Sequence, residues 1–153
     1  MNGRGAYPDP VPVFICPNCK RRCVDLDGYE GFSSQAAQCR ECGFGFLFQL
    51  REDYYPAPGT GFVVCDRDAR ILAAGRGVFE LTGYGDADLL GRNLAEALAL
   101  SDSGPLELVR EWGVRKLGQD VAIRTRAGIE KRVTADFFPA YDADGGLLVA
   151  LTP

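Results

Sequence analysis

Four cysteines arranged in two pairs are the residues in this sequence best suited to chemistry. Cys16 and Cys19 form the first pair and Cys39 and Cys42 the second, with two residues inside each pair and nineteen between the pairs. A Cys-x-x-Cys turn directs two sulfur atoms toward one point, so two such turns supply the four thiolates of a tetrahedral zinc site. The spacing matches the two-pair zinc pattern, and we predict one structural zinc ion bound by these four residues.

Two other chemistries also use paired cysteines. Disulfides form in oxidising compartments, but residues 1–12 are polar and rich in glycine and proline, unlike a secretion signal. We therefore expect a cytoplasmic location, where paired cysteines more often bind metal. A rubredoxin-like iron site usually has a glycine after its first pair, where this chain has Lys20. Both alternatives stay open beside the preferred zinc site.

The cysteine segment resembles a zinc ribbon over residues 11–52. That resemblance implies a hairpin tip at each cysteine pair, with residues 11–15 leading into the first tip and residues 44–50 leading away from the second. About 40 residues bury too little apolar surface to fold alone. The binding free energy of the metal, about 10–16 kcal/mol in zinc-finger peptides, would therefore serve as the folding free energy of this segment. We expect residues 1–10 to be a flexible N-terminus.

Two further cysteines lie outside the pairs. Cys23 follows a run of three cations, which favour a thiolate, so exchange into the metal site or redox sensing is open. We favour the plainer interpretation, a small core residue on a ribbon strand. Cys65 lies in a short apolar run and is predicted to be a small buried residue.

The 153-residue chain contains no histidine. This excludes the Ser-His-Asp and Cys-His catalytic arrangements and histidine-ligated haem. Asp66 and Asp68 would be candidates for an acid–base pair, but they lie in a polar turn between two apolar runs. We therefore expect a protein that is not an enzyme.

The net charge of −4, from 17 basic and 21 acidic residues, indicates no general attraction to nucleic acid or to anionic membranes. No apolar run approaches the roughly 20 residues that cross a bilayer, so we expect no membrane partner. The basic run at residues 20–22 is an exception. This run leaves open the alternative that the protein is a nucleic-acid-associated transcriptional regulator whose ribbon contacts DNA or RNA. Protein docking and structural capping are two other roles open to the ribbon.

Residues 53–60 are rich in proline and glycine and are predicted to form a linker. Downstream, apolar runs, glycine breaks and alternating patterns predict strands and helices. In chain order we expect strands at residues 62–65 and 71–74, short helical turns at 78–100, a longer helix from 105 with its stop at Gly118, and strands at 120–126, 129–141 and 147–151.

This order of elements is similar to the PAS fold, and several motifs match as well. Leu81-Thr82-Gly83-Tyr84 followed by Asp88-Leu89-Leu90-Gly91-Arg92 resembles the family's Gly-Tyr…Glu-Leu-Leu-Gly-Arg signature. Residues 64–72 resemble its opening hairpin, and residues 138–146 resemble the turn before its final strand. The resemblance implies a PAS-like domain over residues 61–153. The expected fold class is α+β, a small zinc ribbon plus a PAS-like antiparallel five-stranded sheet with flanking short helices.

PAS domains sense small molecules, redox state or light, or they mediate protein contacts, and their helices and sheet enclose a pocket. Because the sequence offers no polar anchor for a ligand, we favour an apolar core that is filled by its own side chains. The candidate lining residues are Val63, Leu81, Leu90, Leu94, Leu98, Trp112, Phe137 and Val149.

Two positions depart from the PAS pattern. Many PAS domains place an asparagine before the first helix, where this chain has Gly75. Gly91-Arg92-Asn93 resembles the flavin-binding LOV subfamily, but Leu94 stands where LOV domains need the cysteine that forms the flavin adduct. We therefore expect no LOV-type flavin adduct.

Together these patterns predict a non-catalytic sensory or regulatory module that acts through a protein partner, with a small-molecule ligand left open. Apolar residues of the ribbon's last strand and of the linker need cover. We expect the ribbon to dock on the PAS sheet through Phe46, Phe48, Tyr54 and Tyr55, and we expect a homodimer built around that region.

Overall fold

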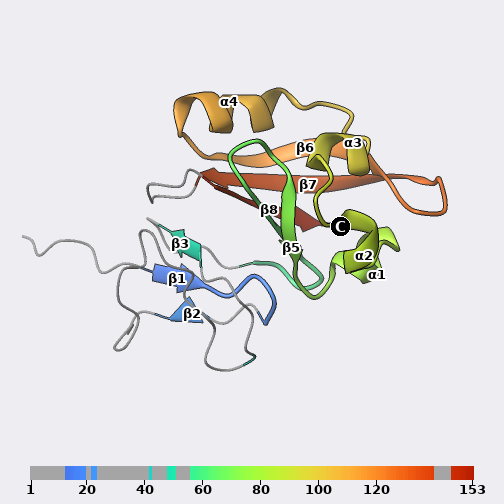
Figure 1. Ribbon diagram of the computed structural model, residues 1–153, viewed down its shortest axis with the longest axis horizontal. Coiled ribbons are helices and arrows are strands. Elements are labelled where there is room, and N and C mark those ends of the chain that lie inside the picture. Colours follow the sequence, from blue (N-terminus) through green and yellow to red (C-terminus); the bar gives the residue numbers. More distant parts are fainter. Residues whose placement is uncertain (1–12, 20–21, 24–41, 43–47, 51–55, 140–145) are drawn as a thin grey trace, which may run out of the picture.

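The computed structural model describes residues 13–19, 22–23, 42, 48–50, 56–139 and 146–153. It contains two sheets, a small one near the N-terminus and a larger one that carries the helices (Figure 1). The small sheet lies on the side of the large sheet away from helix α4 (Gly104–Trp112).

The small sheet is antiparallel, with strand order β2-β1-β3. Its strands are β1 (Val13–Ile15), β2 (Arg22–Cys23) and β3 (Phe48–Leu50). In the central strand, Ile15 is paired with Arg22 on one side and with Phe48 on the other. β1 and β3 lie within residues 11–15 and 44–50, the segments that the ribbon resemblance expects to lead into and away from the cysteine tips. Residues 44–47 of the expected last strand lie outside the described residues.

The larger sheet has five antiparallel strands in the order β5-β4-β8-β7-β6. The last strand of the chain lies between β4 and β7, so the sheet is complete only when the C-terminal strand is in place. The predicted antiparallel five-stranded sheet is confirmed. Its strands are β4 (Gly61–Cys65), β5 (Ile71–Ala74), β6 (Lys116–Arg124), β7 (Glu130–Pro139) and β8 (Leu147–Thr152).

Three short helices and one longer helix connect β5 to β6. They are α1 (Val78–Thr82), α2 (Asp86–Leu89), α3 (Leu94–Ala97) and α4. Helix α4 packs against β6 and β7, and α1 and α2 lie beside β4 and β5 (Figure 1). No helix in the described part of the chain is long and apolar enough to cross a membrane.

The longer helix ends earlier than the sequence analysis predicts. It stops at Trp112 because Gly113 adopts a left-handed conformation, with φ 64°, and donates its N–H to the carbonyl of Val109. A glycine at this position closes a helix without the steric cost that a side chain would bring. The predicted stop at Gly118 is therefore wrong, and residues 116–118 already belong to β6.

Alternate residues of the central strands pack on opposite faces of the large sheet, as the two-residue repeat of a strand requires. On β4, Val63 and Cys65 belong to the cluster beneath the helices, whereas Phe62 and Val64 belong to a second cluster on the outer face. That outer cluster also contains Ile15 from the small sheet. Because β4 is buried on both faces, the N-terminal segment acts as the second layer of cover for the sheet.

Candidate functional site

Three cysteine sulfurs meet at the end of β1. Cys16 follows β1 directly, and the next residues form a turn that brings Cys19 back, with its N–H 3.5 Å from the Cys16 Sγ. The Sγ atoms of Cys16, Cys19 and Cys42 all lie within 4.8 Å of one another, and those of Cys16 and Cys42 are 3.5 Å apart. The predicted convergence of the first pair on Cys42 is thus present. Cys39 lies outside the described residues.

The geometry of these sulfurs fits a metal ion. Tetrahedral zinc–sulfur bonds of about 2.3 Å place two sulfurs about 3.8 Å apart, close to the separation of 3.5 Å between Cys16 and Cys42. A disulfide requires about 2.05 Å between sulfurs, so these two sulfurs are not bonded to each other. The cluster offers three corners of a tetrahedral site and is able to hold a metal.

Burial favours the neutral thiol of Cys16 unless a cation binds to it. Cys16 is fully buried, and burial raises the pKa of its thiol above the ordinary value, while backbone N–H groups of Asn18 and Cys19 lower it to a smaller extent. A buried thiolate needs a compensating positive charge. A metal ion bound to the three sulfurs would supply that charge.

Asn18, in the turn between Cys16 and Cys19, connects the cysteine cluster to the large sheet. Its Nδ2 donates to the Sγ of Cys42 at 3.6 Å, and its Oδ1 accepts the backbone N–H of Arg76 at 3.0 Å. The sequence analysis did not select Asn18. Its two partners lie 24 and 58 residues away in the chain, and no local pattern signals such a pair of contacts.

Gly75 lies against the same turn. A β-carbon at position 75 would collide with the carbonyl group of Pro17 and would lie 3.0 Å from the Cα of Asn18. Gly75 is buried, and its N–H donates to the carbonyl of Phe62 at 2.9 Å. The departure from the PAS pattern at this position therefore has a steric cause, since a side chain here would exclude the cysteine turn.

Docking of the N-terminal segment on the large sheet is observed, through residues other than those expected. Ile15 is fully buried in the outer-face cluster, and the turn after Cys16 contacts Gly75 and Arg76. Of the four residues expected to make the contact, Phe46, Tyr54 and Tyr55 lie outside the described residues, and only the backbone of Phe48 is described.

Six of the eight candidate pocket residues lie together in the cluster beneath the helices. They are Val63, Leu81, Leu94, Leu98, Phe137 and Val149. Leu90 and Trp112 do not join them and are 48% and 67% exposed. Leu90 follows the last residue of α2, and its neighbour Leu89 takes the buried position. Trp112 is the last residue of α4, where the helix has passed its buried positions Leu106 and Val109.

The buried polar side chains of the described residues are satisfied within the protein. Thr60 and Thr82 each donate to a backbone carbonyl at 2.7 Å. Asp136 accepts the backbone N–H of Gly118 at 2.7 Å. These bonds stabilise turns and strand edges and leave no polar group directed at a ligand from these three residues. Asp136 lies opposite Ala150 of the outer-face cluster, whereas Thr82 is a buried residue of α1.

Cys65 is 1% exposed on β4, and burial raises the pKa of its thiol to about 12, with a smaller contribution from the carboxylate of Asp66. The prediction of a small buried residue is confirmed. For Cys23 only the backbone in β2 is described, paired with Phe14, so its interpretation as a core residue or a redox sensor stays a prediction.

The two aspartates considered as an acid–base pair lie in the turn between β4 and β5. Asp66 accepts the backbone N–H groups of Asp68 and Arg70 at 2.8 and 3.0 Å. This is the pattern of an Asx turn. It gives Asp66 a structural role and supports the interpretation of these residues as turn residues.

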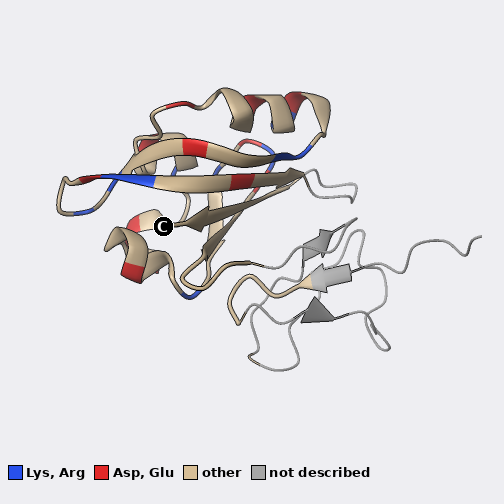
Figure 2. Cartoon of the chain, turned by 180° about the vertical axis from the view of Figure 1, so that it is seen from behind, with Lys and Arg blue, Asp and Glu red and all other residues tan. Residues whose placement is uncertain are grey.

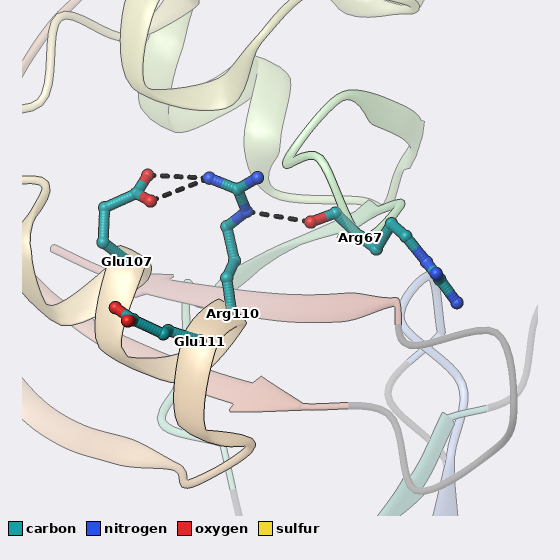
Figure 3. A pocket seen from close by; sticks show the side chains of 4 residues that line it. All are labelled: Arg67, Glu107, Arg110 and Glu111. Atoms are coloured by element: carbon teal, nitrogen blue, oxygen red, sulfur yellow. Dashed lines mark hydrogen bonds and ion pairs between the residues drawn. The ribbon is translucent and has the colours of Figure 1, made fainter.

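A shallow groove of about 410 Å³ lies between this turn and α4 and is lined by Arg67, Glu107, Arg110 and Glu111 (Figure 3). Arg110 donates to both carboxylate oxygens of Glu107 at 2.8 and 2.9 Å and to the backbone carbonyl of Arg67 at 2.8 Å. These contacts fasten α4 to the β4–β5 turn. The guanidinium of Arg110 and the carboxylate of Glu107 are thus used within the protein, which gives this part of the groove a structural explanation.

Basic residues of the large sheet lie among acidic ones. Figure 2 shows blue and red segments on both β6 and β7, and Arg132 pairs with Asp120 across these strands at 3.0 Å. Lys20 and Arg21 lie outside the described residues, and only the backbone of Arg22 is described. Contact between the predicted ribbon and DNA or RNA therefore stays a prediction.

No protein-family model matches the sequence, and no curated protein matches it. The chain is similar to the solved structure of the light-state dimer of the fungal blue-light photoreceptor Vivid, at 16% identity and a TM-score of 0.57, covering 68% of this chain and 84% of that chain. It is similar to the PAS domain of nitrogen regulation protein NR(II) from Vibrio parahaemolyticus, at 18% identity and a TM-score of 0.53, covering 61% and 88%. It is also similar to the light-state LOV domain of the photoreceptor Aureochrome1, at 23% identity and a TM-score of 0.50, covering 60% and 79%.

At these identities the similarity establishes the fold alone. The five-stranded antiparallel sheet with its short helices has a PAS-like fold, shared by PAS and LOV domains. The expectation of a PAS-like sheet with flanking short helices is confirmed.

Proposed function

We propose that this protein is a non-catalytic sensory or regulatory module in which a structural zinc ion supports an N-terminal ribbon and a PAS-like domain acts through a partner protein or a small ligand. The observation that carries the proposal is the convergence of three cysteine sulfurs within 4.8 Å, immediately beside a PAS-like fold. In this proposal the ribbon covers residues 11–52 and the PAS-like domain covers residues 61–153.

The zinc ion would be bound by Cys16, Cys19, Cys42 and, as the fourth ligand, Cys39. The strands of the small sheet are only two or three residues long. Such a sheet has little apolar surface of its own, and metal binding would supply most of its folding free energy. Bound zinc holds four thiolates at fixed positions and performs no redox chemistry. Its proposed role here is therefore structural.

We assign the signalling role to the PAS-like domain, with a protein partner as the preferred target. The packing of the six candidate pocket residues in one cluster supports a filled core. A second copy of the chain is the first partner to test, because the Vivid structure to which this chain is similar is a dimer in its light state. The proposed location is the cytoplasm.

The test is mass spectrometry of the purified full chain under native conditions, together with a visible spectrum and analysis of released small molecules. The expected result is a colourless protein with one zinc per chain. A chain without zinc, or a coloured chain that contains iron, would overturn the metal assignment. A redox cofactor with measurable turnover would overturn the non-catalytic role.

Sedimentation at tens of micromolar tests self-association. A monomer at that concentration would overturn the homodimer and leave a different protein or a small ligand as the target. Binding to generic duplex at low salt, lost as salt rises, would instead favour a nucleic-acid-associated regulator.

A further inference from the structure

We propose that Asn18 links the metal centre to the corner between β5 and α1, so that metal binding and the conformation of the PAS-like domain are energetically coupled. The proposal rests on the metal site proposed above. In this proposal Asn18 is a positioning residue that holds the Arg76 backbone relative to the metal centre. Gly75 provides the space into which the turn between Cys16 and Cys19 packs.

Both ends of the Asn18 amide are engaged. The Nδ2 group donates to the Sγ of Cys42 at 3.6 Å, and the Oδ1 atom accepts the N–H of Arg76 at 3.0 Å. The amide is planar and rigid, so the position of the sulfur determines where the oxygen points. A metal-bound thiolate is a stronger acceptor than a neutral thiol, because hydrogen bonds to charged groups are stronger. Metal binding would therefore hold the amide in the orientation that bonds Arg76.

Gly75 makes the close approach of the two parts possible. A β-carbon there would meet the Pro17 carbonyl and the Asn18 Cα. The backbone of Gly75 does not adopt a positive φ, unlike seven other glycines in the described residues. Conformational freedom therefore does not require a glycine at this position. A glycine is required because only a residue without a β-carbon leaves space for the cysteine turn. This indicates that the surface at Gly75 is shaped to receive that turn.

The contact of the cysteine turn with Gly75 and Arg76 lies next to α1, so a displacement of these two residues would reach the core beneath the helices. The N–H of Val78, the first residue of α1, bonds the carbonyl of Gly75 at 3.3 Å. Val78 and Leu81 of α1 are buried in the cluster beneath the helices. A change at Gly75 and Arg76 therefore acts on α1. Because coupling between two sites is reciprocal, a ligand or partner that moves α1 would change metal affinity by the same factor.

The test measures zinc affinity by competition with a chromophoric chelator, in the full chain, for the wild type and for the variants Asn18→Ala and Gly75→Ala. We expect each variant to bind zinc about tenfold more weakly, as is typical when an outer partner of a metal ligand is removed. The matched control is Gly85→Ala. Gly85 also lacks a positive φ, but its added β-carbon would make only an ordinary contact, 3.7 Å from Asp88 Oδ2.

A second measurement follows hydrogen exchange of the Arg76 amide by NMR, with and without zinc. Zinc should slow this exchange in the wild type and in Gly85→Ala. The variant Asn18→Asp keeps an acceptor toward Arg76 but removes the donor toward Cys42. Zinc folds the ribbon in this variant too, so zinc should still slow the exchange of the Arg76 amide, but to a smaller extent than in the wild type, because the acceptor is no longer oriented by the sulfur of Cys42.

The outcomes separate the two proposals. If the wild type binds no zinc, the proposed metal site fails. If the wild type binds one zinc but both test variants match the affinity of Gly85→Ala, or if zinc leaves Arg76 exchange unchanged, the coupling through Asn18 is overturned and the metal site stands.

Discussion

Ile15 of the small sheet and Phe62 of β4 are both fully buried in one apolar cluster on the outer face of the large sheet. Phe62 lies opposite Ala150 of β8, and both residues belong to that cluster. The N-terminal segment and the PAS-like sheet therefore share a core. Because the two parts share this core, apolar packing stabilises their association. Substitutions in the core can measure that stabilisation.

Replacing Ile15 with alanine should release part of this association. Loss of a buried isoleucine side chain typically costs about 2–5 kcal/mol, and we expect a loss in this range in urea unfolding of the full chain. The matched control is Ile129→Ala, because Ile129 is 63% exposed and surface substitutions usually change stability by less than about 0.5 kcal/mol. Equal stabilities of the two variants would contradict a shared core.

Replacing Cys39 with serine should remove zinc and unfold the ribbon while the PAS-like domain still unfolds cooperatively. A serine hydroxyl is a poor substitute for a thiolate ligand, and the ribbon depends on the metal for its folding free energy. Native mass spectrometry and circular dichroism report the two effects. Cys65→Ala serves as the control and should keep one zinc. Retention of one zinc in a double variant that lacks both Cys16 and Cys39 would contradict the ligand assignment.

The thiol of Cys65 should make stability depend on alkaline pH. Burial raises its pKa from 9.0 to about 12 in the folded chain, so below pH 9 both folded and unfolded chains hold the proton and stability is unaffected. Between pH 9 and 12 the unfolded chain loses the proton first, and folding is disfavoured by about 1.4 kcal/mol per pH unit.

The variant Cys65→Val isolates this effect from that of other titrating groups. Between pH 7 and pH 10.5 the wild type should lose about 2 kcal/mol more unfolding free energy than the variant. Chemical unfolding at the two pH values measures both losses. Equal losses in the two proteins would show that the Cys65 thiol titrates near its ordinary value.

Blue light should produce no flavin–cysteine adduct, even after incubation of the protein with flavin mononucleotide. Leu94 is the first residue of α3 and is fully buried, and its hydrocarbon side chain cannot form a bond to the flavin. Absorbance near the flavin band should be the same before and after illumination. A reversible light-induced loss of that absorbance would refute the prediction, and the same experiment on Cys65→Val would show whether Cys65 is the reacting thiol.

Local patterns were sufficient for most of the large sheet. The alternation of Lys131, Val133, Ala135 and Phe137 predicts one face of β7, and the last three residues do lie in the cluster beneath the helices. Patterns were weaker where two adjacent residues compete for one buried position. Leu89 and Leu90 are chemically identical, and only the path of α2 decides that Leu89 is buried and Leu90 is exposed. The end of α4 was missed for a similar reason, since both Gly113 and Gly118 adopt a positive φ and each was able to serve as the stop.

The sequence by itself determined that Cys16 and Cys19 converge, because a Cys-x-x-Cys turn brings its sulfurs together through local backbone geometry. The approach of Cys42, 26 residues from Cys16, depends on the fold. It also determined the alternation that builds a PAS-like sheet, because side chains of a strand point to opposite faces with a period of two. Only the tertiary structure decided that Asn18 bonds Arg76 and that Gly75 receives the cysteine turn. These contacts join residues nearly 60 positions apart, and they exist only once β1 packs against the outer face of the sheet. Short-range patterns contain no information about that packing.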